Sequence, residues 1–145
     1  MGRREYISLT EELALMEQYL LLEQKRHPFT FEITNRSSID LSQVDFPALL
    51  LQPIIENSIH HGFTKDIVMP AVSIAVEKEN EALKIIIADN GRGFDQVSTL
   101  YGHGLSLVQR RILLLNETRT FNVEMKIKSA SNMGTTTTIT LTNWM

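Results

Sequence analysis

The chain has 145 residues, 43% of them apolar and 21% charged, which is the composition of a globular domain with one hydrophobic core. Its formal net charge of −3 and its lack of a Lys/Arg run argue against nucleic acid as a partner. Cysteine is absent, which excludes a disulfide scaffold and a thiolate metal site and fits a reducing compartment. The sequence holds no apolar run of the ~20 residues that cross a bilayer, and we expect no signal peptide.

The first predicted element is an amphipathic helix over residues 8–26, which ends before Pro28. Either Thr10, or Ser8 together with Glu11, can cap its N-terminus. Its apolar side chains form two stripes, one of Leu9, Leu13, Met16 and Leu20 and a second of Leu15, Tyr19 and Leu22. Two stripes indicate two packing partners: either both meet the core of this domain, or one of them meets another chain or a helix upstream.

A strand follows over residues 29–34, where large apolar residues alternate with polar ones. After a polar connection, we expect Pro47 to open a second helix that Gly62 ends. This helix is apolar nearly all round, so it should be buried against a sheet. Pro53 lies inside it, and we expect this residue to kink the helix or loosen a turn.

The second half of the chain predicts four more strands and one more helix. Alternating apolar residues mark the strands, at residues 72–76, 83–87, 121–127 and 135–141, and helical spacing marks the helix, at residues 105–115. Because the strands alternate with period two, each has one buried face and one wet face. We therefore predict an α+β fold, a two-layer α/β sandwich with a mixed, mostly antiparallel sheet and helices on one face.

The end of the strand at 83–87 carries the most informative motif, DNGRG at residues 89–93. A carboxylate held at a strand end, Asp89, can accept a hydrogen bond from a ligand amino group. Gly91 and Gly93 lack side chains, so a flat ring can pack against bare backbone. A strand-end aspartate that only caps a turn is the common alternative, and the two glycines favour a ligand.

Two further segments suit a nucleotide. Glu56 and Asn57 are polar residues within an apolar helix, and an amide oxygen is a hard ligand suited to Mg²⁺. Gly102 and Gly104 precede a helix, where bare backbone N–H groups can hold a triphosphate. The alternatives are a solvated polar edge and an ordinary glycine-rich turn. Neither a Walker A loop nor a Rossmann fingerprint is present.

The four histidines do not form a metal pattern in the sequence. His60 and His61 are adjacent, so on a helix they point in different directions and cannot share a metal. His27 and His103 have no carboxylate or cysteine pattern near them. We therefore expect no zinc site.

In combination, the motifs resemble those of the LytS/YehU-type sensor histidine kinases. The similar segments are the N box at residues 52–62 (QPIIENSIHHG), the G1 box at 89–93 (DNGRG), the G2 box at 102–105 (GHGL) and the closing G-T element at 134–135. The helix upstream also resembles the segment that precedes this domain in the family. The resemblance covers nearly the whole chain and implies a linking helix over residues 1–28, followed over residues 29–145 by an ATP-binding domain. The implied domain has the Bergerat fold of gyrase B, Hsp90 and MutL.

The resemblance also implies roles for single residues. Asp89 would accept the exocyclic amine of adenine, and Asn57 would be the ligand of Mg²⁺ on the nucleotide. Glu56 would be the catalytic residue, polarising the incoming histidine or a metal-bound water. The other implied nucleotide contacts are His61, Gly91, Gly93, Gly102, Gly104, Leu105 and Thr135.

Two positions depart from related sequences. His60 stands where the family often has lysine, which removes a permanent positive charge. Pro53 stands where hydrolytic relatives have a glutamate that activates water, and proline cannot act as a base. We therefore expect no sustained ATP hydrolysis.

The resemblance thus predicts the catalytic ATP-binding part of a two-component sensor histidine kinase, with ATP and Mg²⁺ as cofactors. The phosphoacceptor histidine would lie on a separate dimerisation domain, and a response regulator would act downstream. The parent would be a membrane-anchored homodimer with this part in the cytoplasm. Two alternatives remain: a non-catalytic nucleotide-binding regulatory module, and an anti-sigma-factor-type serine kinase, which fits the N box less well.

Overall fold

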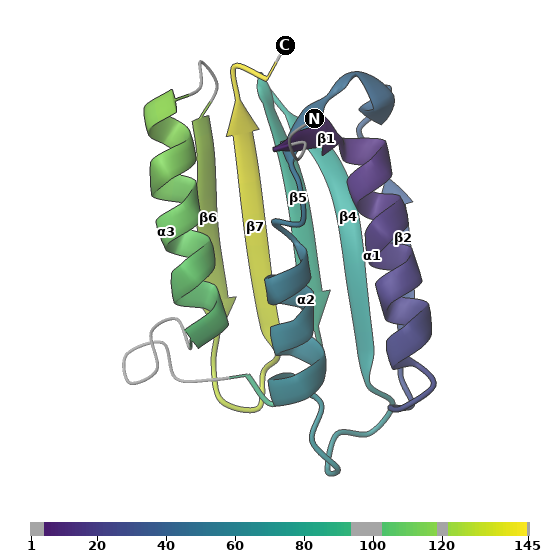
Figure 1. Cartoon of the computed structure of the whole chain (residues 1–145). Helices are drawn as coiled ribbons and strands as arrows, with labels where there is room; N and C mark the ends of the chain where they lie inside the picture. Colours follow the sequence, from purple (N-terminus) through teal and green to yellow (C-terminus); the bar gives the residue numbers. More distant parts are fainter. Residues whose placement is uncertain (1–4, 94–102, 119–121, 145) are drawn as a thin grey trace.

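The computed structural model describes residues 5–93, 103–118 and 122–144 as two layers, a sheet and a set of helices (Figure 1). The sheet has five strands in the order β2-β4-β5-β7-β6. Their bounds are β2 Thr30–Asn35, β4 Ala71–Glu79, β5 Ala82–Asp89, β6 Asn122–Ser129 and β7 Thr135–Thr142. Only the β2–β4 pair is parallel in this sheet, and the other three pairs are antiparallel. The predicted two-layer α+β fold with a mostly antiparallel sheet is therefore confirmed.

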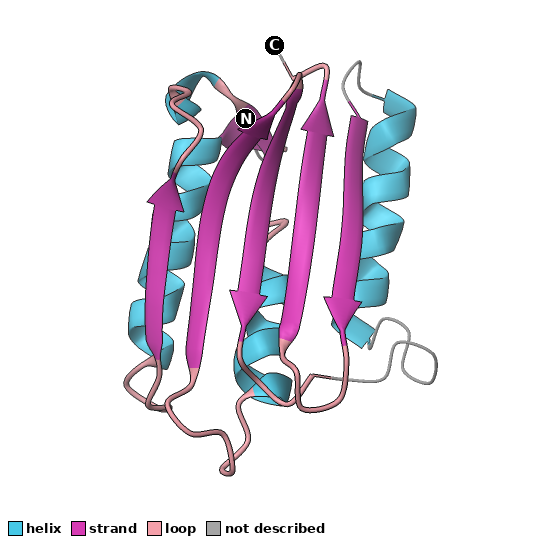
Figure 2. Cartoon of the chain, turned by 180° about the vertical axis from the view of Figure 1, so that it is seen from behind, coloured by secondary structure: helices cyan, strands magenta, loops and turns pink. Residues whose placement is uncertain are grey.

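The helices cover one face of the sheet, and Figure 2 shows that no element of the described residues covers the opposite face. The helices are α1 Leu9–Glu23, α2 Gln52–Asn57, which a π-helical turn (η2) Ser58–Gly62 continues, and α3 His103–Thr118. In both views α2 lies between α1 and α3. The N-box segment is thus the central element of the helical layer.

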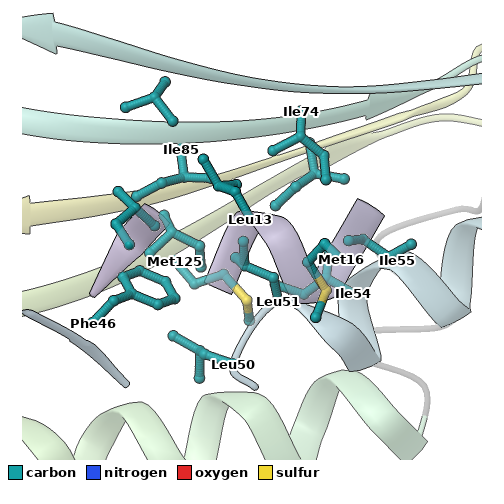
Figure 3. Close-up of a cluster of buried hydrophobic side chains, with 14 of the residues drawn as sticks. Leu13, Met16, Phe46, Leu50, Leu51, Ile54, Ile55, Ile74, Ile85 and Met125 are labelled. Carbon is teal, nitrogen blue, oxygen red and sulfur yellow. The ribbon is translucent and has the colours of Figure 1, made fainter. Parts of the chain in front are cut away.

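The core lies between the two layers (Figure 3). Its fully buried members come from α1, the short strand at residues 45–47, the α2 region and the central strands. They include Leu9, Met16, Leu20, Phe46, Leu50, Leu51, Ile55, Ile59, Ile74, Leu83, Ile85 and Ile87. Each such side chain contributes about 1.5–3 kcal/mol on leaving water. Buried side chains of α1 belong to the same cluster as those of the sheet, so α1 is packed on the domain and not merely joined to it.

Helix α1 matches the predicted helix at its start and is shorter at its end. Of the two predicted caps, the Ser8 option is confirmed: the Ser8 Oγ accepts from the Glu11 N–H at 3.1 Å, and the Glu11 carboxylate reaches back to the Ser8 N–H. The first apolar stripe is buried. The second stripe is divided: Leu15 and Leu22 are exposed, at 41% and 62%, whereas Tyr19 is partly buried and packs against the core.

The prediction that Pro47 opens a helix is wrong. Pro47 ends a short strand, β3 Asp45–Pro47, which pairs antiparallel with β1 Tyr6–Ser8 in a second, two-stranded sheet. Helix α2 begins only at Gln52, so Pro53 stands in its first turn and not in its interior. In the first turn of a helix, backbone N–H groups have no helical carbonyl to bond to, so a proline there removes no hydrogen bond. The predicted kink is therefore also wrong.

The sequence also missed one short 3₁₀-helix, η1 Leu41–Gln43, within the polar connection. Asp40 caps it by accepting from the Ser42 N–H at 3.1 Å. None of the helices in the described ranges is both long and apolar enough to span a bilayer.

Candidate functional site

The start of helix α2 is held by a side chain from another helix. Leu51, the residue at its N-cap, offers no side-chain cap. Instead, the Glu12 carboxylate of α1 accepts from the N–H groups of Leu49 at 2.7 Å and Leu51 at 3.1 Å. Glu12 is fully buried, and burial raises the pKa of its carboxyl group. This contact sets where the N box begins.

Glu56 and Asn57 lie at the junction of α2 with the π-helical turn. Glu56 accepts from the Gln52 amide at 3.1 Å, one turn earlier in the same helix. Asn57 is half-buried, and its side chain makes no hydrogen bond within the described parts of the chain. The turn after it closes with a bond from the Phe63 N–H to the Ser58 carbonyl, a five-residue spacing. Such π turns are frequent at functional sites because they redirect side chains.

Asp89, at the end of β5, is fixed from two sides. The Ser58 hydroxyl donates to one carboxylate oxygen at 2.6 Å, and the Gly91 N–H donates to the other at 2.8 Å. Burial raises the pKa of the Asp89 carboxyl group, and hydrogen bonds from Ser58, Gly91 and the Thr135 backbone partly oppose that rise. A carboxylate has about four lone-pair sites, so these three donors leave one for a ligand.

The backbone after β5 approaches the end of the N-box segment very closely. A Cβ at Gly91 would lie 2.7 Å from the Gly62 carbonyl oxygen and 2.8 Å from its carbon. The Arg92 N–H donates to that same oxygen at 2.9 Å. Gly91 is therefore required by packing within the chain, which adds a structural reason to the ligand contact predicted for it.

The other two glycines near this site adopt left-handed backbone conformations. Gly93 has φ +66°, and a Cβ there would clash with the Ala130 carbonyl oxygen. Gly134 has φ +76°, and a Cβ there would clash with the carbonyl oxygen of Asp89. An L side chain is disfavoured in this region, so both positions need glycine on backbone grounds. The β6–β7 turn is thereby brought against the end of β5.

The remaining predicted residues lie at different depths. Thr135 is the antiparallel partner of Asp89, so β7 brings the closing G-T element to the site. His61 is exposed at the end of the N-box segment. Leu105 is buried in the core, which gives it a packing role. Gly104 lies in the first turn of α3, and Gly102 lies outside the described residues.

Sequence reasoning missed two residues that shape this site, Ser58 and Glu12. Ser58 is a polar residue of the N box that is buried, and a buried hydroxyl needs a partner. Glu12 stands three residues after Leu9 and four before Met16, on the buried stripe of α1. A carboxylate on a buried helix face also demands hydrogen-bond donors, and that was the available signal.

Comparison with known proteins identifies the family of this chain. The family model described as "Histidine kinase-, DNA gyrase B-, and HSP90-like ATPase" matches residues 43–144. Sensor histidine kinase BtsS of Escherichia coli is 32% identical over 108 residues, 74% of this chain and 19% of BtsS. Sensor protein LytS of Bacillus subtilis is 34% identical over 92 residues, 63% of this chain and 16% of LytS. The chain thus spans less than a fifth of these relatives.

Solved structures share the fold at low sequence identity. The histidine kinase domain of the blue-light activated kinase of Erythrobacter litoralis has a TM-score of 0.71 and 17% identity, covering 97% of this chain and 69% of that one. The catalytic domain of histidine kinase ThkA has a TM-score of 0.66 and 10% identity, with 98% and 97% covered. Because the family match extends over more than half of its residues, this chain belongs to the histidine kinase-, DNA gyrase B- and HSP90-like ATPases.

Proposed function

We propose that this chain is the catalytic ATP-binding domain of a sensor histidine kinase, which positions Mg-ATP for phosphoryl transfer to a histidine on a separate dimerisation domain. The observation that carries the proposal is Asp89, a half-buried carboxylate at a strand end that Ser58 and Gly91 hold in place. A fixed acceptor of this kind selects adenine, whose exocyclic amine can donate to it. Guanine presents a carbonyl at that position and would be repelled.

The donor set also fits Mg²⁺. The Asn57 amide is half-buried and unbonded within the described residues, so its oxygen is available as a hard ligand. The ion would neutralise charge on the phosphate oxygens, which is the main contribution of metals to phosphoryl transfer. His61, exposed beyond Asn57, and the start of α3 at Gly104 are the proposed neighbours of the phosphates, together with Gly102.

Glu56 is the proposed catalytic carboxylate. It lies beside Asn57, and its bond from Gln52 fixes one of its oxygens while leaving the other to act on the incoming histidine. Pro53, three residues earlier, offers no base for activating water. The chain would therefore hold ATP for transfer rather than hydrolyse it, and most of its catalysis would be positioning.

The wider assembly follows from the same proposal. The acceptor histidine would belong to the dimerisation domain of a longer, membrane-anchored homodimeric parent, with the present domain in the cytoplasm and a response regulator downstream. The exposed stripe of α1, Leu15 and Leu22, is a surface on which such a neighbouring domain could pack. Nucleic acid is not expected as a partner, because the chain has a net negative charge.

Nucleotide-dependent melting tests the proposal. ATP or ADP with Mg²⁺ should raise the melting temperature, and GTP should not. At a hundredfold excess of nucleotide over Kd, binding adds about 2.7 kcal/mol to the free energy of unfolding. Asp89→Asn should remove the response, whereas Asp40→Asn, at an exposed carboxylate that only caps η1, should keep it. Equal stabilisation by ATP and GTP would refute the adenine assignment.

Transfer in trans separates the kinase from its alternatives. Alone with labelled ATP, the chain should neither label itself nor turn over ATP appreciably. Mixed with the histidine-bearing domain of its parent, it should label that domain slowly, because tethering normally supplies about millimolar effective concentration. Binding without any transfer would indicate a regulatory module, and labelling of a serine-bearing partner would indicate the serine kinase.

A further inference from the structure

Two histidines that lie far apart in the sequence converge on one carboxylate. His60, in the N-box turn, places its Nε2 atom 2.9 Å from Glu23 Oε2, and His27 places its Nε2 atom 4.0 Å from the same oxygen. The three candidate ligand atoms all lie within 4.8 Å of one another. Glu23 and His27 are one helical turn apart in the sequence, but His60 lies 37 residues from Glu23, so the full cluster was not predicted.

The chemistry of the three groups is that of a transition-metal site. Two imidazoles and one carboxylate are the protein ligands of many zinc sites that keep an open fourth position. Bonds of about 2.0–2.1 Å in a tetrahedron place neighbouring ligand atoms about 3.4 Å apart. The observed separations bracket that value, and both histidine side chains are about half exposed, so small side-chain rotations can reach it.

The surroundings favour a cation over a simple hydrogen-bonded pair. Glu23 is buried, at 8% exposure, so its charge is poorly compensated by water. The hydroxyl of Tyr19, four residues before Glu23, is buried without a partner in the described chain and supplies no charge to balance the carboxylate.

We propose that Glu23, His27 and His60 bind a divalent transition-metal ion of the Zn²⁺ class through Oε2 and the two Nε2 atoms. Bound there, the ion joins the C-terminal end of α1 to the N box, one helical turn beyond Asn57. The site is separate from the proposed Mg²⁺ position, since imidazole ligands suit zinc, nickel and copper, whereas Mg²⁺ prefers oxygen. This inference revises the expectation that the histidines form no zinc site.

Metal titration without nucleotide tests the proposal on tag-free chain stripped with a chelator. Calorimetry should detect one Zn²⁺ per chain, Co²⁺ should give visible absorption bands, and Zn²⁺ should raise the melting temperature while Mg²⁺ does not. Loss of an outer-shell partner already costs about 10- to 100-fold in metal affinity, so His27→Gln and His60→Gln should each weaken Zn²⁺ binding about tenfold or more. Glu23→Gln should do the same.

His61→Gln is the matched control, because His61 is adjacent to His60 in the same turn but outside the cluster. It should leave the Zn²⁺ affinity unchanged. Should Glu23→Gln fail to fold, the two half-exposed histidine positions still decide the matter. Zn²⁺ affinity that is unaffected by His27→Gln or His60→Gln, or reduced equally by His61→Gln, would overturn the site. Nucleotide is absent throughout, so these outcomes do not depend on the kinase proposal.

Discussion

The close approach of Gly91 to Gly62 gives a prediction with a built-in control. In Gly91→Ala, the new Cβ would lie 2.7 Å from the Gly62 carbonyl oxygen, so the backbones must separate by about 0.7 Å to reach ordinary contact at 3.4 Å. That shift strains the bond from the Arg92 N–H, worth about 1 kcal/mol, and adds overpacking strain of about 1–3 kcal/mol. We expect a total loss of about 2–4 kcal/mol.

Gly62→Ala probes the same contact from its other side. There the new Cβ would meet its nearest atom, the Asp89 Oδ1, at 3.6 Å, which is ordinary van der Waals contact. Because alanine also restricts the unfolded chain, Gly62→Ala should be neutral or stabilise by up to about 1 kcal/mol. Urea unfolding at constant slope, or melting, measures both variants; about 2–4 °C is expected per kcal/mol at this chain length. Equal stability of the two variants would refute the packing argument.

Three further predictions concern the same region. Glu12→Ala should lower the free energy of unfolding, measured in urea, by about 2–3 kcal/mol, because the Leu49 and Leu51 N–H groups lose their acceptor. The control is Glu17→Ala, at an exposed position of α1, and an equally small loss in both variants would contradict the prediction. Burial raises the pKa of Asp89, so the folded chain holds the carboxyl proton more tightly than the unfolded chain does. The resulting stabilisation is complete below the ordinary pKa of 3.8, and it is lost as the pH rises through the raised pKa. The stability of wild type relative to Asp89→Asn should therefore fall over that pH range, and a rise would reverse the assigned sign. Asn57→Ala should weaken Mg²⁺-dependent ATP binding, whereas Glu56→Gln should spare affinity and slow transfer in the full-length kinase; abolished binding in Glu56→Gln would make Glu56 structural.

The elements that the sequence predicted correctly are those with a strong periodic signal. The strands β4 and β5 alternate cleanly, and Ser8 with Glu11 forms a local cap that three residues suffice to specify. Pro47 failed for a different reason. The residues around Pro47 are typical of a helix start when taken alone, but Pro47 pairs with β1, some 40 residues away, and so lies in a strand. Non-local pairing of this kind leaves no local trace.

The candidate site divides in the same way. Asp89 and the two glycines that follow it lie within five consecutive residues, so their motif can be recognised in the sequence. The partners that hold Asp89 and the N box come from elsewhere: Ser58 lies 31 residues from Asp89, and Glu12 belongs to α1. Neither partner can be assigned before the register of the helices on the sheet is known. Burial of a polar residue identifies that a partner is needed but does not identify the partner.

These contacts make α1 part of the site's support rather than a passive connection. At its first turn Glu12 fixes the start of the N box, and at its last turn Glu23 contacts His60 near the end of the N box. The helix that carries Asn57 is therefore held at both ends by a single neighbouring helix, and both contacts use buried carboxylates. A displacement of α1 along its axis cannot keep both contacts, because the two carboxylates are fixed on one rigid element. A displacement of α1 would therefore act on both ends of the segment that carries Asn57, the proposed Mg²⁺ ligand.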